Sequence, residues 1–209
     1  DAKGRGQPKG PTQAERERHE LTHIPFRSWC ETCVMAKARA NAHPRLSPEH
    51  VLTRVPVVQA DYTYPGGSEH PPCITLFCTQ THHCAALPVG AKGPHDAYAS
   101  RFIADFLSEL GHQELVLQHD PEAALSACCK AAAAKHWATV RLRDTPVGSH
   151  QSNGSVERFH RSLHAHIRAN RVQLERALQI DLIKHAPALL GWLYRHAGWL
   201  HARYHRLDT

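Results

Sequence analysis

The 209-residue sequence contains no apolar run approaching the roughly 18 residues that a membrane-spanning helix needs, which excludes an integral membrane protein. It has no initiating Met and no signal-peptide pattern, so we expect a processed product or a fragment of a longer chain. It has no disulfide framework either, because seven cysteines is an odd number and only Cys30 and Cys33 have a recognisable spacing. This favours a reducing compartment.

The charges are unevenly distributed along the chain. Lys and Arg number 25 against 19 Asp and Glu, a net charge of +6. The net charge is +4 over residues 1–46, −4 over 47–140 and +6 over 141–209. An acidic centre between basic ends suits a protein that binds phosphates and holds metal cations, although ordinary surface variation is an alternative explanation.

The order of apolar patterns predicts the class of fold. Residues 1–14 are rich in Gly, Pro and Lys and predict a flexible basic tail, and a linker is expected over 41–54. Short β-branched and apolar runs predict five strands, and helical spacing predicts four helices. The strands are expected over 55–62, 74–79, 84–89, 115–118 and 139–142, and the helices over 95–110, 121–136, 152–176 and 181–204. This order predicts an α/β protein with a mixed sheet and helices on its faces.

Three carboxylates stand at the expected ends or beginnings of separate elements. Asp61 lies inside the first strand, where a buried carboxylate needs a partner or a cation. Asp120 lies between a strand and Pro121, a position typical of sites in α/β sheets, but also suited to a helix N-cap. Glu157 lies at the edge of the apolar stripe of its helix, where a solvated charged face is the alternative. Three such carboxylates can converge on two divalent cations, as phosphoryl transfer requires.

The segments that hold these carboxylates resemble a known motif. ADYTY with Asp61, QHDPEAAL with Asp120 and PVGSHQSNGSVERFHRSL with Glu157 resemble the DDE motif of retroelement integrases. The 36 residues between Asp120 and Glu157 are close to the spacing habitual in that family. HELTHIPFRSWCETC is similar to the zinc segment that precedes the core in LTR-retrotransposon polyproteins. The resemblance covers about residues 15–205 and extends in particular to copia-like polyproteins.

The resemblance implies a ribonuclease-H-like catalytic core over 50–175, a helical extension over 176–209 and metal-dependent DNA strand transfer. It implies that Asp61, Asp120 and Glu157 are catalytic and bind two Mg²⁺ or Mn²⁺ ions. Side chains before and along the catalytic helix are expected to contact DNA, the arginines through its phosphates. These are Gln151, Asn153, Arg158, Arg161, Arg168 and Arg171.

A second pattern lies in the segment over 15–46. His19-x3-His23-x6-Cys30-x2-Cys33 offers four ligands of the types that zinc prefers. Two histidines four residues apart can share a helix face, and a segment this short needs a metal to fold. We expect structural Zn²⁺ there, with a merely packed cysteine pair as the alternative.

These patterns together predict a fragment of an LTR-retroelement integrase, a DDE polynucleotidyl transferase that processes DNA 3′ ends and joins them to a target. The expected partners are double-stranded DNA and further copies of the chain. The expected location is the nucleus, after release from a cytoplasmic polyprotein. Two alternatives remain: a ribonuclease-H-like nuclease without joining activity, and a catalytically dead or domesticated integrase-like module that binds DNA or protein.

Overall fold

The computed structural model of the chain describes residues 10–23, 25–37, 54–67, 70–95, 97–146 and 150–204, without the side chains of residues 36, 37, 150 and 151. The side chain of Gln151, a predicted DNA contact, and most of the expected tail and linker therefore lie outside the described part of the chain. The chain divides into two compact units, Asp1–Leu46 and Ser47–Thr209. Within the described residues, none of the helices combines the length and the apolarity that crossing a bilayer requires.

The N-terminal unit contains two short helices, α1 (Gln13–Glu20) and α2 (Glu31–Lys37). A capping box starts α1, because the backbone N–H of Glu15 donates to the Thr12 hydroxyl and the backbone N–H of Thr12 donates to the Glu15 carboxylate. The helix begins two residues before the segment that the sequence pattern outlined. Residues 21–23 and 25–30, which lie between the two helices, are not helical.

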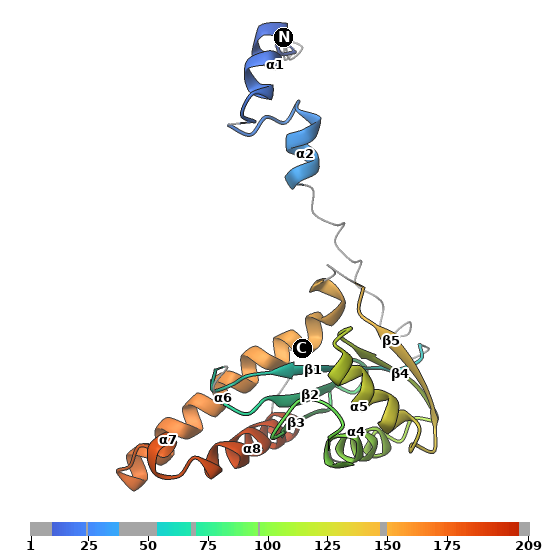
Figure 1. The fold of residues 1–209 in the computed structure, drawn as a ribbon, viewed down its shortest axis with the longest axis vertical. Coiled ribbons are helices and arrows are strands. Elements are labelled where there is room, and N and C mark those ends of the chain that lie inside the picture. Colours follow the sequence, from blue (N-terminus) through green and yellow to red (C-terminus); the bar gives the residue numbers. More distant parts are fainter. Residues whose placement is uncertain are drawn as a thin grey trace, which may run out of the picture. The chain divides into compact units, whose positions relative to one another are not determined.

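The larger unit is built on one five-stranded sheet (Figure 1). Its strands are β1 (Val57–Thr63), β2 (Cys73–Cys78), β3 (Cys84–Pro88), β4 (Glu114–His119) and β5 (Thr139–Asp144). They lie in the order β3-β2-β1-β4-β5, with β2 antiparallel to both β1 and β3, and with β4 parallel to both β1 and β5. The expected α/β class with a mixed five-stranded sheet is confirmed.

Each face of the sheet is covered by two helices (Figure 1). Side chains alternate along β2, so Ile74 and Leu76 pack with α4 (Ala97–Glu109) and α5 (Ala123–Ala133), whereas Cys73 and Phe77 pack with the opposite layer. That layer consists of α6 (Gly154–Leu178) and α8 (Ala188–Tyr204). The 3₁₀ turn η1 (His150–Asn153) leads into α6.

The C-terminal helices differ from the expectation of one helix over 181–204. They are α7 (Leu182–His185) and α8, separated at Pro187, which lacks the N–H that a continuous helix needs. The helix expected from residue 121 begins at Ala123, so Pro121 precedes it. The boundary expected between the catalytic core and the helical extension, at residues 175 and 176, falls inside α6. Helix α8, which falls in the expected extension, packs in the same apolar layer as α6.

Close packing of α8 on β3 gives a test of this arrangement. A Cβ added at Gly198 would lie 2.9 Å from the backbone nitrogen of Ala86, whereas one at Gly191 would meet only ordinary contacts with Pro88. Gly198→Ala should therefore lower the free energy of unfolding by about 1–3 kcal/mol through overpacking. Gly191→Ala, the matched control, should leave it unchanged or raise it by up to about 1 kcal/mol. Equal effects of the two substitutions in urea unfolding would contradict the packing described here.

Candidate active site and metal centre

The three predicted carboxylates come from neighbouring elements of the larger unit. Ala60 on β1 pairs in parallel with His119 on β4, so Asp61 and Asp120, the next residue of each segment, lie toward the same end of the sheet. Glu157 lies in the first turn of α6. The Asp61 side chain is 20% exposed and Asp120 is half-buried. Glu157 is exposed, so it lies further out than the edge of the core where the helical pattern placed it.

The Asp61 carboxylate is repelled by the negative charges of the other two. The pKa of Asp61 is raised to about 7, first by burial, next by the negative charge of Asp120, and then by Glu157 and Glu122. The backbone N–H of Tyr62 donates to Oδ1 of Asp61 at 2.7 Å and favours the charged form, but does not offset the other effects. Asp120 and Glu157 therefore both lie near enough to Asp61 to repel its negative charge.

Two buried glutamines hold the start of α6 against the sheet. Gln59 on β1 and Gln118 on β4 are paired neighbours, and their side-chain N–H groups donate to the backbone oxygen of Ser152 at 2.7 and 2.8 Å. Gln118 also donates to Oδ1 of Asn153, and the backbone N–H of Val156 donates to Oε1 of Gln59. We call Gln59, Gln118 and Asn153 the polar clamp. Because buried polar groups need partners, these bonds favour one position of the helix start.

The polar clamp extends to Asp120. The side-chain N–H of Asn153 donates to Oδ1 of Asp120 at 2.9 Å, and Arg143 donates to the side-chain oxygen of Gln118 at 2.5 Å. Asn153 is only 3% exposed, so this predicted DNA contact is enclosed between the sheet and the helix. The interpretation of Asp120 as a helix N-cap is wrong, because Glu122 occupies that position of α5.

Two histidines of α6 face the sheet. Nε2 of His160 lies 2.6 Å from Oγ1 of Thr75, and Nε2 of His164 lies 2.8 Å from Oγ1 of Thr63. Burial, and to a smaller extent the charge of His164, lowers the pKa of His160 to about 4, and burial also lowers the pKa of His164. With His160 neutral at pH 7, the 4.0 Å approach of its Nδ1 to Oδ2 of Asp61 is not an ion pair.

Four of these side chains carry no motif of their own, and sequence patterns did not identify them: Gln59, Gln118, Thr75 and His160. Gln59 lies two residues before Asp61 and so shares its face of the strand, a signal that strand periodicity could have supplied. The other three depend on the strand register and on the rotation of α6, which only the fold determines.

The arginines of α6 do not share one environment. Arg161 and Arg168 are exposed. Arg171 is half-buried, and its Nε lies 3.6 Å from Oε1 of Glu175. Arg158 lines a cavity of about 480 Å³ between α6, the turn from β2 to β3 and α8. Arg161 and Arg168 are therefore the two arginines that the helix leaves most accessible on the side of Glu157.

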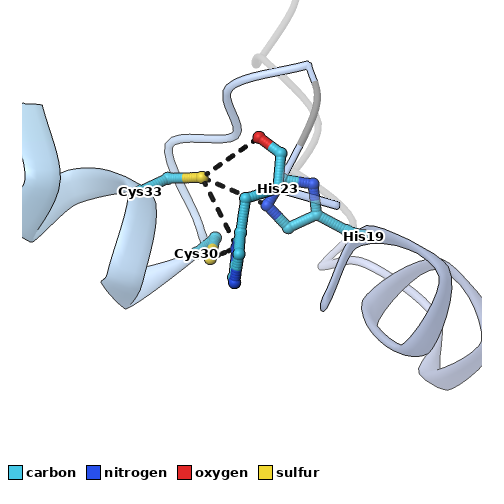
Figure 2. A group of neighbouring side chains, drawn as sticks. All are labelled: His19, His23, Cys30 and Cys33. Carbon is cyan, nitrogen blue, oxygen red and sulfur yellow. Dashed lines mark hydrogen bonds between the residues drawn. The ribbon is translucent and has the colours of Figure 1, made fainter. Parts of the chain in front are cut away.

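Four side chains of the N-terminal unit converge on one point (Figure 2). They are His19, His23, Cys30 and Cys33, and their ligand atoms all lie within 4.8 Å of one another, so the group could hold a metal ion. Nε2 of His19 lies 3.2 Å from Sγ of Cys33, and Nδ1 of His23 lies 3.5 and 3.8 Å from Sγ of Cys30 and Cys33. Among the described residues, no other group of three or more His, Cys, Asp or Glu side chains has its ligand atoms close enough together to hold a metal ion. The carboxylates of Asp61, Asp120 and Glu157 are therefore not gathered around one point in the same way.

The two histidines reach this point differently from the expectation of a shared helix face. His19 lies in the last turn of α1, whereas His23 lies beyond the helix with a φ of +53°. This left-handed conformation turns the chain so that both rings meet the cysteines (Figure 2). Cys30 directly precedes α2 and Cys33 lies in its first turn. The Trp29 ring packs edge-on against the ring of His19, with 4.9 Å between the ring centroids.

Comparison of the chain with protein-family models gives no match, and comparison with curated proteins gives none. The assignment of function therefore depends on the chemistry of the two groups of side chains and on the motifs that contain them.

The raised pKa of Asp61 predicts a pH-dependent effect of its removal. An acid whose pKa is raised by folding destabilises the folded protein as the pH rises from about 4 to 7. Asp61→Asn should therefore raise the free energy of unfolding at pH 8 by about 2–4 kcal/mol without divalent cations, and by less than about 1 kcal/mol at pH 4. Urea unfolding at both pH values measures this. The exposed Asp105→Asn is the control, and a wild type as stable as Asp61→Asn at pH 8 would contradict the account.

Proposed function

We propose that the chain is an integrase fragment of an LTR retroelement, which uses Mg²⁺ or Mn²⁺ to process DNA 3′ ends and to join them to target DNA. The observation that carries this proposal is the placement of Asp61, Asp120 and Glu157 on β1, at the end of β4 and at the start of α6, where the charges of Asp120 and Glu157 both oppose the ionisation of Asp61. Three like charges brought together at a sheet end favour divalent cations as their partners.

The strand order supports a ribonuclease-H-like core. β1 lies at the centre of the sheet, antiparallel to β2 and parallel to β4. This order is compatible with the fold that the DDE resemblance implies. Likeness of fold alone does not determine function, so the carboxylates carry the assignment.

In the proposed reaction, Asp61 and Asp120 would hold one cation, and Glu157 would complete a second site with Asp61. When bound, such cations activate an attacking oxygen and stabilise a leaving oxygen in an in-line displacement at phosphorus. Asn153 orients Asp120 through its 2.9 Å hydrogen bond. The polar clamp keeps the helix that carries Glu157 at the end of β1 and β4.

DNA would lie along the exposed side of α6. Arg161 and Arg168 follow Glu157 by four and eleven residues, so all three lie toward one side of the helix. Their guanidinium groups are suited to bind phosphates and to position the duplex without reading its sequence.

Zn²⁺ is the metal that best suits the His19, His23, Cys30 and Cys33 group. In a tetrahedral zinc site, bonds of about 2.05 Å to nitrogen and 2.3 Å to sulfur place these atoms about 3.6 Å apart. The nitrogen–sulfur distances of 3.2, 3.5 and 3.8 Å bracket this value. A two-His, two-Cys set without an open position suits a structural role, which would stabilise a unit too small for a sufficient core of its own.

Substitution of Glu157 separates catalysis from binding. Glu157→Gln removes a cation ligand, so cutting and joining of an oligonucleotide duplex with Mg²⁺ or Mn²⁺ should fall below detection. Binding of the same duplex should be unchanged or slightly tighter, because a negative charge is lost near a polyanion. The exposed Glu109→Gln on α4 is the control and should keep full activity. A Glu157→Gln protein that still joins strands would refute the enzymatic proposal, and cutting without joining by the wild type would favour a nuclease.

Substitution of the two accessible arginines tests the DNA path. Arg161→Ala with Arg168→Ala should flatten the log–log dependence of affinity on salt by about 1.8, about 0.9 for each phosphate contact, whatever the DNA sequence. The matched control is Arg101→Ala with Lys130→Ala, two exposed cations on α4 and α5. Fluorescence anisotropy over a salt series measures the slope. An unchanged slope in the α6 double variant would place the DNA elsewhere.

Loss of a cysteine ligand tests the zinc proposal. Cys30→Ser should bind less than one zinc per chain after dialysis and should lose the helicity of the N-terminal unit, because the metal supplies its stability. Cys78→Ala, which changes a buried core thiol of the sheet, should retain one zinc. Mass spectrometry measures the zinc content, and circular dichroism measures the helicity. Equal zinc contents in the two variants would favour the packed cysteine pair.

A further inference from the structure

Hydrogen bonding fixes the tautomer of His160. Oγ1 of Thr75 lies 3.0 Å from the backbone oxygen of Asp61, which can only accept, so the single hydroxyl proton is directed there. The same Oγ1 lies 2.6 Å from Nε2 of His160 and must accept the hydrogen bond that this ring N–H donates. Nε2 therefore carries the hydrogen of the neutral ring, and Nδ1 carries a lone pair.

This lone pair faces the carboxylate of Asp61. Nδ1 of His160 lies 4.0 Å from Oδ2 of Asp61, which is too long for a hydrogen bond. The other carboxylate oxygen, Oδ1, already accepts the backbone N–H of Tyr62. A cation with bonds of about 2.1 Å to each atom could span up to about 4.2 Å, so the two facing acceptors lie within reach of one ion.

We infer that Nδ1 of His160 is a nitrogen ligand for the cation that Asp61 holds, so that the site has a mixed nitrogen and oxygen donor set. The inference rests on the proposed function, because it adds a ligand to the same metal site. The Thr75 contact supports it independently: histidines that bind metals usually donate their other ring N–H to an oxygen acceptor, which fixes the ring.

The donor set determines which cation the site prefers. Carboxylates and water suit Mg²⁺, whereas imidazole nitrogen favours divalent transition metals. A site built from Asp61, Asp120 and His160 should therefore bind Mn²⁺ in preference to Mg²⁺. A site with carboxylates alone would lack this added preference.

Pulsed electron paramagnetic resonance of the Mn²⁺-loaded full chain, with Zn²⁺ saturating the N-terminal group, tests the inference. The wild type should show coupling of Mn²⁺ to an imidazole nitrogen. His160→Gln keeps an amide N–H that can reach Thr75 but has no Nδ1, so the coupling should disappear. Its Mn²⁺ affinity should fall at least about tenfold while its Mg²⁺ affinity changes less than about threefold.

His164→Gln is the matched control, because His164 lies one turn further along α6 and contacts Thr63 in the same manner. It should keep the nitrogen coupling. Mn²⁺ binding that requires Asp61 but shows no nitrogen coupling in the wild type would overturn the inference and leave the proposed function intact. Loss of coupling in His164→Gln but not in His160→Gln would also overturn it. Mn²⁺ binding unaffected by Asp61→Asn would instead refute the proposed metal site itself. The wild-type spectrum decides the question even if His160→Gln fails to fold.

Discussion

The hydrogen bonds of Gln59 and Gln118 to the start of α6 are the constraint on which the candidate active site depends. Both side chains are buried at paired positions of β1 and β4, and both donate to the same backbone oxygen at Ser152. If this helix start shifted, these buried amides would lose their partners, at about 1–3 kcal/mol for each unsatisfied group. The position of Glu157 near Asp61 therefore depends on the polar clamp.

The same arrangement holds Asp61 in an unfavourable state. Burial and the charges of Asp120 and Glu157 all oppose its ionisation, and the one backbone hydrogen bond to Oδ1 does not compensate. A core designed for stability alone would place an apolar or amide side chain there. Charge repulsion that a bound cation would relieve is typical of sites shaped by function, where stability is given up for binding.

The sequence predicted the elements better than the site. Strand and helix patterns identified the five strands, and the apolar stripe of Val156, Phe159 and Leu163 correctly marked the buried face of α6. The break at Pro187 was predictable because proline lacks the backbone N–H that a helix interior needs, but the apolar spacing continues across it and suggested one helix.

What periodicity could not predict depends on contacts between distant segments. In the sequence, Asn153 looks like an ordinary polar loop residue. Its contacts with Gln118 and Asp120 depend on how the chain returns to the sheet, which periodicity does not reveal. His160 is one of 19 histidines, and only its contact with Thr75 distinguishes it. The ligands of the N-terminal group were evident from the spacing of its histidines and cysteines, but the left-handed turn at His23 was not.

The central claim is that Asp61, Asp120 and Glu157 share divalent cations at the carboxyl ends of β1 and β4. Anomalous diffraction from crystals of the chain soaked in Mn²⁺ tests it most directly. The account predicts two manganese peaks that both contact Asp61, one shared with Asp120 and the other with Glu157. Manganese that binds elsewhere and leaves Asp61 without a cation would contradict it.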